Sequence, residues 1–421
     1  MVKKLSAIIF VLVVTAAMCV VLNDCVYAGN GTRMLGFSAR DSAMGGATTA
    51  SSEDTSCLVR NPAGLVLIGN RIDAEYLNMI PHGVSMNTEG RIVTPPVSLS
   101  NIGREQSSTV RYIPGVDIGV SYRIPGTDSH PVSVGIGAFT MCGIAVAYPS
   151  SRLNGALIRN NVYDRQVDLR SMRIAPGLAV GITDKLSFGA TGNIAIQGLR
   201  TDLATSPAPL FTETTGAGNW DFTPGGGFTL GLLYVLNDML NLGASYESHG
   251  WMQHHKLYLD TLPYIDEPPV INAGISLKPI KNLELTYDTR YINWTDVKLA
   301  RIKPNEGGFG WQDQWVFATG GEYTTLNDKL KLRLGYNYGK SPVQDNVVFA
   351  NALFPIIMEH HVTTGFSYSL TKNFSLDFTW EHHFMGVKVD NGCGDVYSQN
   401  GVGTKISAAA DIISLGMGYK F

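Results

Sequence analysis

After residue 22 the sequence lacks any apolar run of the about 20 residues that a membrane-spanning helix requires. Charged residues are scarce as well: they make up 16% of the 421 residues, whereas soluble domains average about 25%. The net charge of −3 brings no basic excess of the kind that binds nucleic acid. These absences leave a closed β-barrel as the structure that could cross a membrane, because it pairs all of its backbone polar groups. A water-soluble β protein of this size is the alternative.

Catalytic and cofactor motifs are also missing. The sequence contains no phosphate-binding loop, dinucleotide glycine fingerprint, nucleophile elbow or zinc-protease motif. Beyond the first 28 residues it keeps three cysteines, Cys57, Cys142 and Cys393, an odd number that permits at most one internal disulfide and shows no metal-type spacing. We therefore expect neither an enzyme nor a cofactor.

The N-terminus predicts secretion. Lys3 and Lys4 precede an apolar stretch over residues 5–22, and Val26 and Ala28 are small residues at the spacing that a signal peptidase prefers. We expect a signal peptide over residues 1–28. An uncleaved membrane anchor is the alternative, because the apolar stretch is long for a signal.

Tight polar turns recur along the chain after residue 180. They lie at residues 182–186, 236–240, 279–283, 326–330 and 370–374, and longer loops separate them. Short turns that alternate with long loops predict up-and-down hairpins with two unlike ends. This is the arrangement of a barrel in the bacterial outer membrane, with short periplasmic turns and longer outer loops.

The last strand shows the clearest alternation. Ile413, Leu415, Met417 and Tyr419 alternate with small or polar residues, which predicts lipid on one side of the wall and a lumen on the other. The chain ends on Phe421, and a terminal aromatic of this kind resembles the signal read by the outer-membrane assembly machinery. That machinery and the membrane lipid are therefore expected partners.

Side-chain parity fixes the register of two hairpins. A three-residue turn that pairs Leu370 with Phe374 keeps the apolar rows of its two strands on one face. The two-residue loop 327–328 does the same for its own hairpin. Counting on this basis predicts an all-β, antiparallel, up-and-down barrel over residues 71–421 with about fourteen strands; twelve or sixteen remain open. The expected strands are 71–80, 111–123, 131–146, 165–182, 186–200, 222–236, 240–259, 268–279, 283–302, 313–325, 330–340, 358–370, 374–388 and 408–421.

The segment before the first strand, residues 29–70, does not resemble a strand. Small residues at near-helical spacing, interrupted by Asn61-Pro62, indicate short helices packed in a confined space. A flexible periplasmic tail is the alternative, but Phe37, Met44 and Leu65 give the segment apolar faces that a tail does not need. We expect this segment to plug the lumen as a hatch.

Both ends of the chain resemble the FadL/TodX-type family of outer-membrane transporters for long-chain fatty acids and hydrocarbons. The resemblance covers roughly residues 36–70 and 312–421, and the matching hatch residues are Gly45, Gly46, Asn61, Pro62, Ala63 and Gly64. It implies a monomeric barrel of fourteen strands that takes up a hydrophobic small molecule passively, by capture at the outer loops and passage past the hatch. A general porin or a structural, adhesin-like barrel is the competing class.

The resemblance further implies sideways release through a gap beside an inward-kinked third strand. In this sequence that strand carries Gly135, Gly137 and Gly143, which could permit a kink.

Lumenal cations could hold the carboxylate of an acidic ligand. By alternation Arg290, Lys331 and Arg333 face inward, and these are the candidate ligand contacts. The alternative is that each pairs with a lumenal acid, since buried charges are usually paired.

A last constellation is not part of the resemblance. The register places His361 opposite His383, both inward near the outer rim, with Glu381 and Glu359 nearby. Two histidines and two carboxylates could bind a transition metal or loosen on acidification. The favoured interpretation is that these are polar residues at the water interface.

Overall fold

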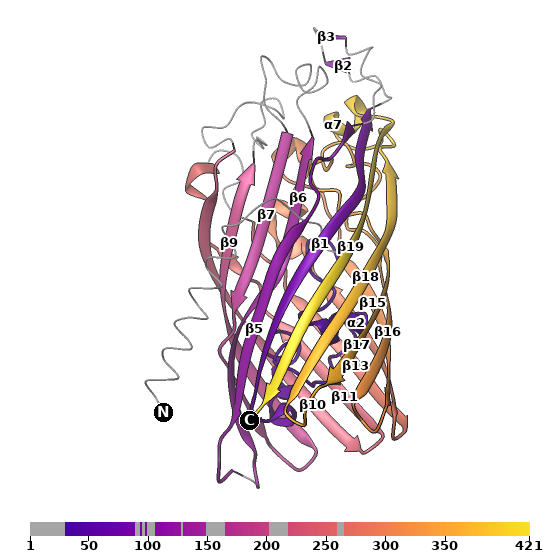
Figure 1. Cartoon of the computed structure of the whole chain (residues 1–421). Helices are drawn as coiled ribbons and strands as arrows, with labels where there is room; N and C mark the ends of the chain where they lie inside the picture. Colours follow the sequence, from indigo (N-terminus) through magenta and orange to yellow (C-terminus); the bar gives the residue numbers. More distant parts are fainter. Residues whose placement is uncertain are drawn as a thin grey trace.

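The computed structural model describes residues 30–88, 93–94, 97–98, 106–127, 129–148, 165–201, 218–258 and 265–421. Its described part is a tall antiparallel β-barrel with tilted strands, short turns at one end and longer connections at the other (Figure 1). The expected signal peptide lies outside the described residues.

The barrel closes because the first strand pairs with the last, from Arg71 opposite Lys420 to Thr88 opposite Thr404. The wall strands are β1 (Arg71–Thr88), β5 (Ile113–Arg123), β6 (Val132–Tyr148), β7 (Arg165–Ile174), β8 (Gly177–Gly181), β9 (Leu186–Thr201), β10 (Asp221–Asn237), β11 (Leu240–Glu247), β12 (Trp251–Met252), β13 (Val270–Ile280), β14 (Leu283–Ile292), β15 (Gln314–Thr325), β16 (Leu330–Gly339), β17 (His360–Ser369), β18 (Phe374–Val389) and β19 (Thr404–Lys420). β7 and β8 form one crossing, as do β11 and β12, so the wall has fourteen strands and the predicted number is confirmed.

Three shorter strands add to this wall or stand apart from it. The short β4 (Gln106–Ser107) pairs with β1 near its upper end. β2 (Val93–Thr94) and β3 (Val97–Ser98) pair only with each other.

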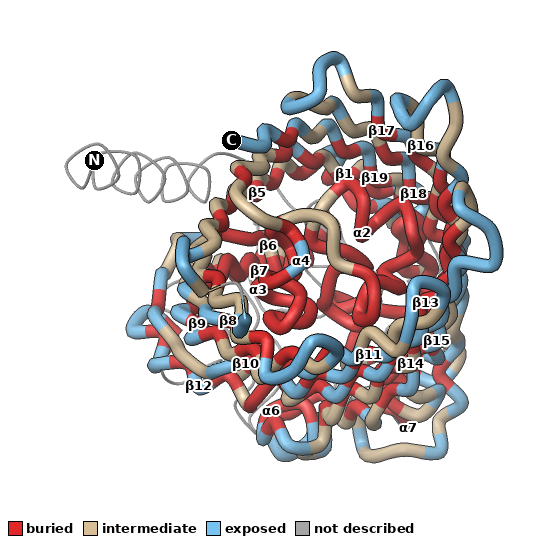
Figure 2. The backbone as a smooth tube through the Cα atoms, turned by 90° about the horizontal axis from the view of Figure 1, so that it is seen from below, coloured by how far each residue is buried: buried red, intermediate tan, exposed pale blue. Residues whose placement is uncertain are grey.

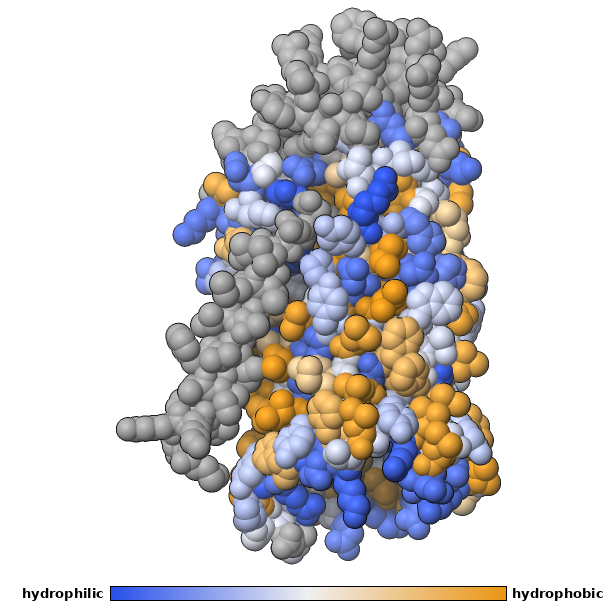
Figure 3. Space-filling view, viewed as in Figure 1, coloured by the Kyte–Doolittle hydropathy of each residue, from blue (hydrophilic) through white to orange (hydrophobic). Residues whose placement is uncertain are grey.

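The outer face of the wall is apolar, as the alternation predicts. Along β19, Ile413, Leu415, Met417 and Tyr419 are exposed, while Ser414, between the first two, is buried. In Figure 3 the hydrophobic residues gather over the lower half of the visible wall, above a hydrophilic lower rim. Because these side chains are apolar and face outward, the wall is suited to contact with the hydrocarbon of a membrane rather than with water.

The predicted hairpin registers are confirmed. The Leu370 amide donates to the Phe374 carbonyl at 3.0 Å, and the Lys329 amide donates to the Leu326 carbonyl at 3.3 Å. The second turn holds Leu326, Asn327 and Asp328 at positive φ of 53°, 54° and 66°. This left-handed backbone follows the twist of the flanking strands, and it fixes which residues face the lumen.

Two predicted strands are too long. The strand expected over 283–302 ends at Ile292, because its ladder partners on both sides, Val270 and Gln314, also end there. The strand expected over 240–259 ends in the two-residue β12. A third is interrupted: the crossing over 165–182 breaks at Pro176, which has no backbone N–H for the ladder.

Helices occur inside the barrel and in the outer loops. They are α2 (Ala39–Ala43), α3 (Cys57–Arg60), η1 (Pro62–Gly64), α4 (Leu65–Ile68), η2 (Lys256–Tyr258), η3 (Trp294–Asp296), α6 (Lys298–Arg301), η4 (Pro304–Glu306) and α7 (Val396–Asn400). Among the described residues, none of the helices has the length and apolar character to cross a membrane. All three described cysteines are free thiols; Cys57 and Cys142 are buried and Cys393 is exposed.

Candidate functional site

Residues 30–70, called the lumenal segment below, lie inside the barrel. Seen from below, α2, α3 and α4 coil within the ring of strands and are mostly buried (Figure 2). α2 packs on β16 to β19, whereas η1 packs on β8, β9 and β10. The segment therefore touches the wall on several sides, as a plug does and a free tail does not.

Hydrogen bonds fix the lumenal segment to strands around the barrel. The Asn337 side chain donates to the Gly45 carbonyl at 2.9 Å. The Thr49 amide donates to the Asp288 carboxylate at 2.9 Å. The Asn61 side chain donates to the Leu232 carbonyl at 3.0 Å. These contacts satisfy buried polar groups on both partners, so removing the segment would leave them unpaired.

The hatch residues named from the sequence have local structural roles. Gly45 and Gly46 adopt φ of +67° and +79°, and a Cβ on Gly46 would stand 2.3 Å from the Leu35 carbonyl oxygen. The Asn61 side chain accepts from the Ala63 amide and begins η1, with Pro62 at its first turn. A Cβ on Gly64 would stand 1.9 Å from the Ser52 hydroxyl. Tight packing therefore accounts for these glycines.

A network of charges lies where the lumenal segment meets β14, β15 and β16. The Arg40 guanidinium stands 3.2 Å from Glu53, 3.4 Å from Glu284 and 3.5 Å from Glu322. Lys331 extends the network, with its ammonium 2.6 Å from Glu53 and 2.9 Å from Glu322. Arg40 is thus the cation of the lumenal segment that holds three carboxylates, two of them on the wall.

Burial and charge act in opposite directions on Glu53, which belongs to the lumenal segment. Burial disfavours its charged form, but Arg40, Lys331 and Arg333 outweigh that effect and hold the pKa of Glu53 well below its usual range. The contribution of Glu53 to stability is then present above the unfolded pKa of about 4.3, and it is lost as the pH falls through the lower folded pKa.

Because the stabilising charge of Glu53 is lost at low pH, we expect the plug to open in acid. Ion conductance of the purified protein in a planar lipid bilayer should stay low and constant from about pH 5 to 8 and rise below about pH 4. In Glu53→Gln the carboxylate is absent, so conductance should be higher at pH 7 and its acid rise smaller. An acid rise of the same size in Glu53→Gln would contradict this role.

The three predicted lumenal cations all face inward, and all are engaged. Arg333 pairs with Glu322 at 2.7 Å, and Lys331 bridges Glu53 and Glu322. Arg290 donates to the Asn272 side chain at 2.8 Å and to the Gly46 carbonyl at 3.2 Å. Their structural partners are therefore lumenal acids, an amide and the lumenal segment, and contact with a ligand stays a prediction.

The predicted histidine cluster differs from its expected form. His361 and His383 are opposite each other with ring centroids 4.5 Å apart, and Glu381 lies 3.2 Å from His383. All three are buried rather than at a wet rim, because α2 packs over β17 and β18. Glu359 lies apart and accepts from the Ser341 amide at 3.0 Å. Among the described residues the groups that could hold a metal lie elsewhere, so metal binding here finds no support; a response to acid stays a prediction.

The third strand, β6, leaves its neighbour halfway along the wall. β5 and β6 pair from Arg123 opposite Ser133 up to Ile118 opposite Ala138, and there the described ladder stops. Higher up, the Met141 carbonyl accepts from the Met34 amide at 3.2 Å, so this part of β6 pairs with the lumenal segment instead. Above Ala138, β6 therefore bends inward, away from β5. Near its upper end it meets the chain that precedes β5 again, where the Thr109 amide donates to the Ala147 carbonyl at 2.9 Å.

The irregularity that permits this bend is at Met141. The register of β6 against β7 shifts between Thr140 and Cys142, which is a β-bulge. Of the three predicted glycines, Gly135 and Gly137 lie below the break and Gly143 lies above it. No sequence signal marks a methionine bulge, so Met141 was not among the predicted site residues.

The outer loops form an aromatic pocket above the lumenal segment. Phe309 and Trp311 stack with centroids 4.8 Å apart, and Trp294 meets Trp311 edge-on at 5.2 Å. A cavity of about 20 Å³ lies among these side chains, and Met141 and Leu169 complete its apolar lining. A ligand must therefore push the loops apart to bind there.

The lower end of the lumen holds a second, larger cavity. A cavity of about 260 Å³ opens toward the short turns and is lined by charged groups that include Arg40, Glu53, Arg71, Lys372 and Lys420. The cavity under the outer loops is lined mainly by aromatic and aliphatic side chains, with Arg33, Asp266 and Glu267 also on its wall, whereas charged groups are more numerous around the cavity near the turns.

Comparison with known proteins identifies the relatives of this chain. Residues 28–421 match the model of a family described as outer membrane protein transport protein (OMPP1/FadL/TodX). The chain belongs to this family. It is thus an outer-membrane β-barrel of a transport family rather than an enzyme. None of the curated proteins matches the chain.

Solved structures agree on the fold. The toluene transporter TodX of P. putida superposes with a TM-score of 0.66 at 18% identity, over 92% of this chain and 99% of TodX. The Ralstonia pickettii toluene transporter TbuX gives 0.61 at 18% identity, over 92% and 99%. A Pseudomonas aeruginosa FadL homologue gives 0.62 at 15% identity, over 93% and 100%.

Proposed function

We propose that this family member takes up hydrophobic compounds passively, the class that includes long-chain fatty acids and aromatic hydrocarbons. The ligand is captured among the outer loops, passes beside the lumenal segment, which acts as the hatch, and leaves sideways into the membrane. The protein acts as a monomer that the assembly machinery inserts through its C-terminal strand. The observation that carries the proposal is the inward bend of β6 at Met141, because it interrupts the ladder between β5 and β6.

The capture step depends on the aromatic pocket. Burying apolar surface contributes about 25 cal/mol per Å². A pocket with Trp294, Phe309 and Trp311 on its wall can therefore bind an apolar ligand without an ion pair between ligand and protein. Because Arg290, Lys331 and Arg333 are already engaged, a neutral ligand fits this interior better than an anionic one.

The release step follows from the charged groups around the lower cavity. An apolar ligand that continued downward would meet Arg40, Glu53 and Arg71 there. At the break between β5 and β6 it meets buried apolar side chains instead: Leu77, Met79 and Ile113. The sideways route therefore keeps the ligand out of water until it reaches lipid.

The lumenal segment separates this function from that of a general porin. A porin needs an open aqueous lumen, whereas here residues 30–70 fill the interior and bond to the wall. An interior filled in this way does not suit the continuous water column of a porin, whereas a single ligand can pass by displacing loop and hatch side chains.

Uptake by whole cells tests the proposal. The chain would be produced in a Gram-negative host that lacks its own transporters of this family, with radiolabelled toluene and oleate as probes. Uptake of at least one probe should exceed that of the empty host about tenfold, while a hydrophilic sugar should show no gain. A gain for the sugar alone would support the porin.

Trp311→Ala should lower uptake about tenfold, which corresponds to a loss of about 1.4 kcal/mol of ligand contact. Trp311 lies in the pocket and its indole N–H donates to Asn351 at 2.7 Å. Trp315→Ala is the matched control, since this tryptophan faces outward on β15 and is 55% exposed. Equal uptake by the two variants would refute a role for the pocket.

A further inference from the structure

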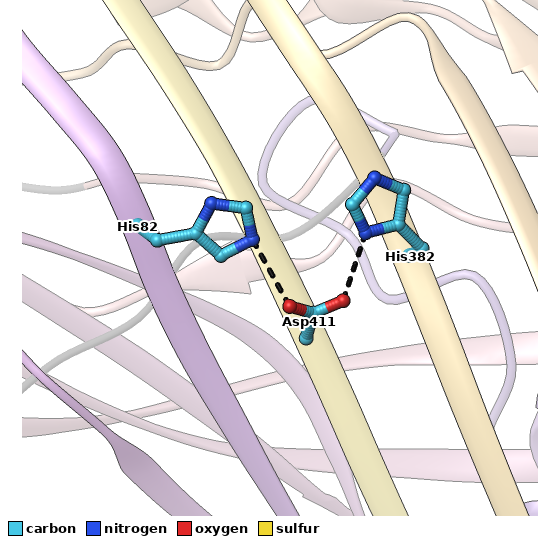
Figure 4. Close-up of side chains that lie close together, drawn as sticks. All are labelled: His82, His382 and Asp411. Atoms are coloured by element: carbon cyan, nitrogen blue, oxygen red, sulfur yellow. Dashed lines mark hydrogen bonds and ion pairs between the residues drawn. The ribbon is translucent and has the colours of Figure 1, made fainter.

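Three polar side chains meet on the outer face of the barrel wall (Figure 4). His82 comes from β1, His382 from β18 and Asp411 from β19, which lies between them. The His82 Nε2 atom stands 3.0 Å from Asp411 Oδ2, and the His382 Nδ1 atom stands 2.8 Å from Asp411 Oδ1. The two imidazole rings stack with centroids 6.0 Å apart. Each oxygen of the carboxylate thus faces one ring nitrogen.

This cluster occupies a place where polar groups are costly. Asp411 lies in the same outward row as Ile413, Leu415 and Met417, which face lipid. His382 follows Phe374 by eight residues, so a rise of about 3.3 Å per residue at a tilt of about 40° puts it about 20 Å higher. The apolar band of such barrels is about 25 Å tall, which places the cluster near its outer edge.

The backbone directs these side chains toward one another. The ladder between β1 and β19 shifts between His82 and Ser85, and the ladder between β18 and β19 shifts between His383 and Gly386. Gly83, next to His82, adopts φ of +61°, which favours glycine. The ladders of β1 and β18 with β19 are thus both irregular at the same height. Such bulges can turn side chains toward one another that a regular ladder would keep parallel.

We propose that His82, His382 and Asp411 bind a divalent transition-metal ion such as Zn²⁺. In the tetrahedral geometry that zinc prefers, ligand atoms bound at about 2.1 Å stand about 3.4 Å apart. Here one ligand atom from each of the three residues lies within 4.8 Å of the other two, so small side-chain rotations bring them to that spacing. Two imidazoles and one carboxylate suit zinc-like ions, whereas Ca²⁺ and Mg²⁺ prefer an all-oxygen set. The ion takes the place of the protons that the rings share with the carboxylate.

The surroundings support a metal rather than a simple ion pair. The Trp380 indole N–H donates to Asp411 Oδ1 at 3.1 Å and orients the carboxylate, as outer partners of metal ligands do. The His82 side chain is 42% exposed, so water can complete the coordination from outside.

Two other clusters in the described part of the chain lack these properties. The carboxylates of Glu53, Glu284 and Glu322 also lie close together, but Arg40, Lys331 and Arg333 already pair with them. His249 contacts Asp266 through Nε2 and Asp296 through Nδ1, so its two acids lie on opposite sides of one ring and cannot share an ion.

Zinc binding to the untagged full-length protein in detergent tests the proposal, measured by calorimetry with zinc chloride. The wild type should bind one zinc ion per barrel, and His82→Ala/His382→Ala should weaken that binding at least tenfold. His249→Ala is the matched control and should bind as the wild type does. Equal binding by the wild type and the double variant, or an equal loss in His249→Ala, would overturn the proposal.

A stability measurement tests whether the ion joins three strands. Because a ligand of the folded state stabilises it, zinc should raise the temperature at which the folded barrel is lost in a gel-shift assay. The rise should appear in the wild type and in His249→Ala and be absent from the double variant and from Asp411→Asn, in which the carboxylate is replaced by an amide of the same shape. A rise in the double variant, or no rise in the wild type, would contradict a site that bridges β1, β18 and β19.

Discussion

Replacement of Arg40 by alanine should turn the plugged barrel into an ion-conducting pore. Arg40 is the cation that the lumenal segment places among Glu53, Glu284 and Glu322. Removing one partner from a buried ionic cluster costs about 3–5 kcal/mol, because the remaining charges stay buried without compensation. The variant can avoid that cost by letting water enter and the segment loosen, and single-channel recordings in a planar bilayer would show this as a raised conductance.

The control for this prediction keeps the charge. Arg40→Lys retains a cation at the same place, so its conductance should stay much closer to that of the wild type. If Arg40→Ala remained as closed as the wild type while still folded, the charge network would not hold the plug. The hydrogen bonds that Asn337 donates to Gly45 and that Asp288 accepts from Thr49 would then have to do so.

Deletion of Met141 should stop uptake of hydrophobic compounds while leaving the barrel folded. Met141 is the extra residue of the bulge between Thr140 and Cys142, and its removal lets the upper part of β6 continue the ladder with β5. A regular ladder would close the sideways route, so uptake of toluene should fall at least tenfold. The folded barrel would be recognised by its heat-dependent migration on gels.

Met141→Leu is the matched control for the deletion. It keeps the extra residue and an apolar side chain of similar size in the pocket, so β6 should still bend toward Met34 and uptake should remain near the wild-type level. Uptake that survived the deletion would show that the ligand does not leave between β5 and β6.

The wall of this barrel could be predicted in detail, because the face to which each side chain points depends on nearby sequence. A strand has a period of two, so one turn of known length fixes every side chain on both of its strands. That is why the pairing of His361 with His383 followed from residues 370–374 alone. The outer ends of strands were less predictable: the chain between Ile292 and Gln314 folds as short helices because its ladder partners stop, which no local pattern reveals.

The interior was predicted only in part, because its contacts join residues far apart in sequence. Inward cations could be named from alternation, but their partners depend on where the lumenal segment lies. Arg33 pairs with Glu247 at 2.8 Å across 214 positions, and neither was singled out. The contact of His82 and His382 with Asp411 could not be predicted, because it joins β1 and β18 across β19 and depends on the closure of the barrel.

The closure of the barrel also constrains how the molecule is made. β1 follows the lumenal segment directly and pairs with β19, the strand of the wall farthest from it in sequence. Because the lumenal segment bonds to β10, β14, β16 and β18, we expect it to bring distant hairpins together before the seam between β1 and β19 forms, and so to assist assembly of the wall.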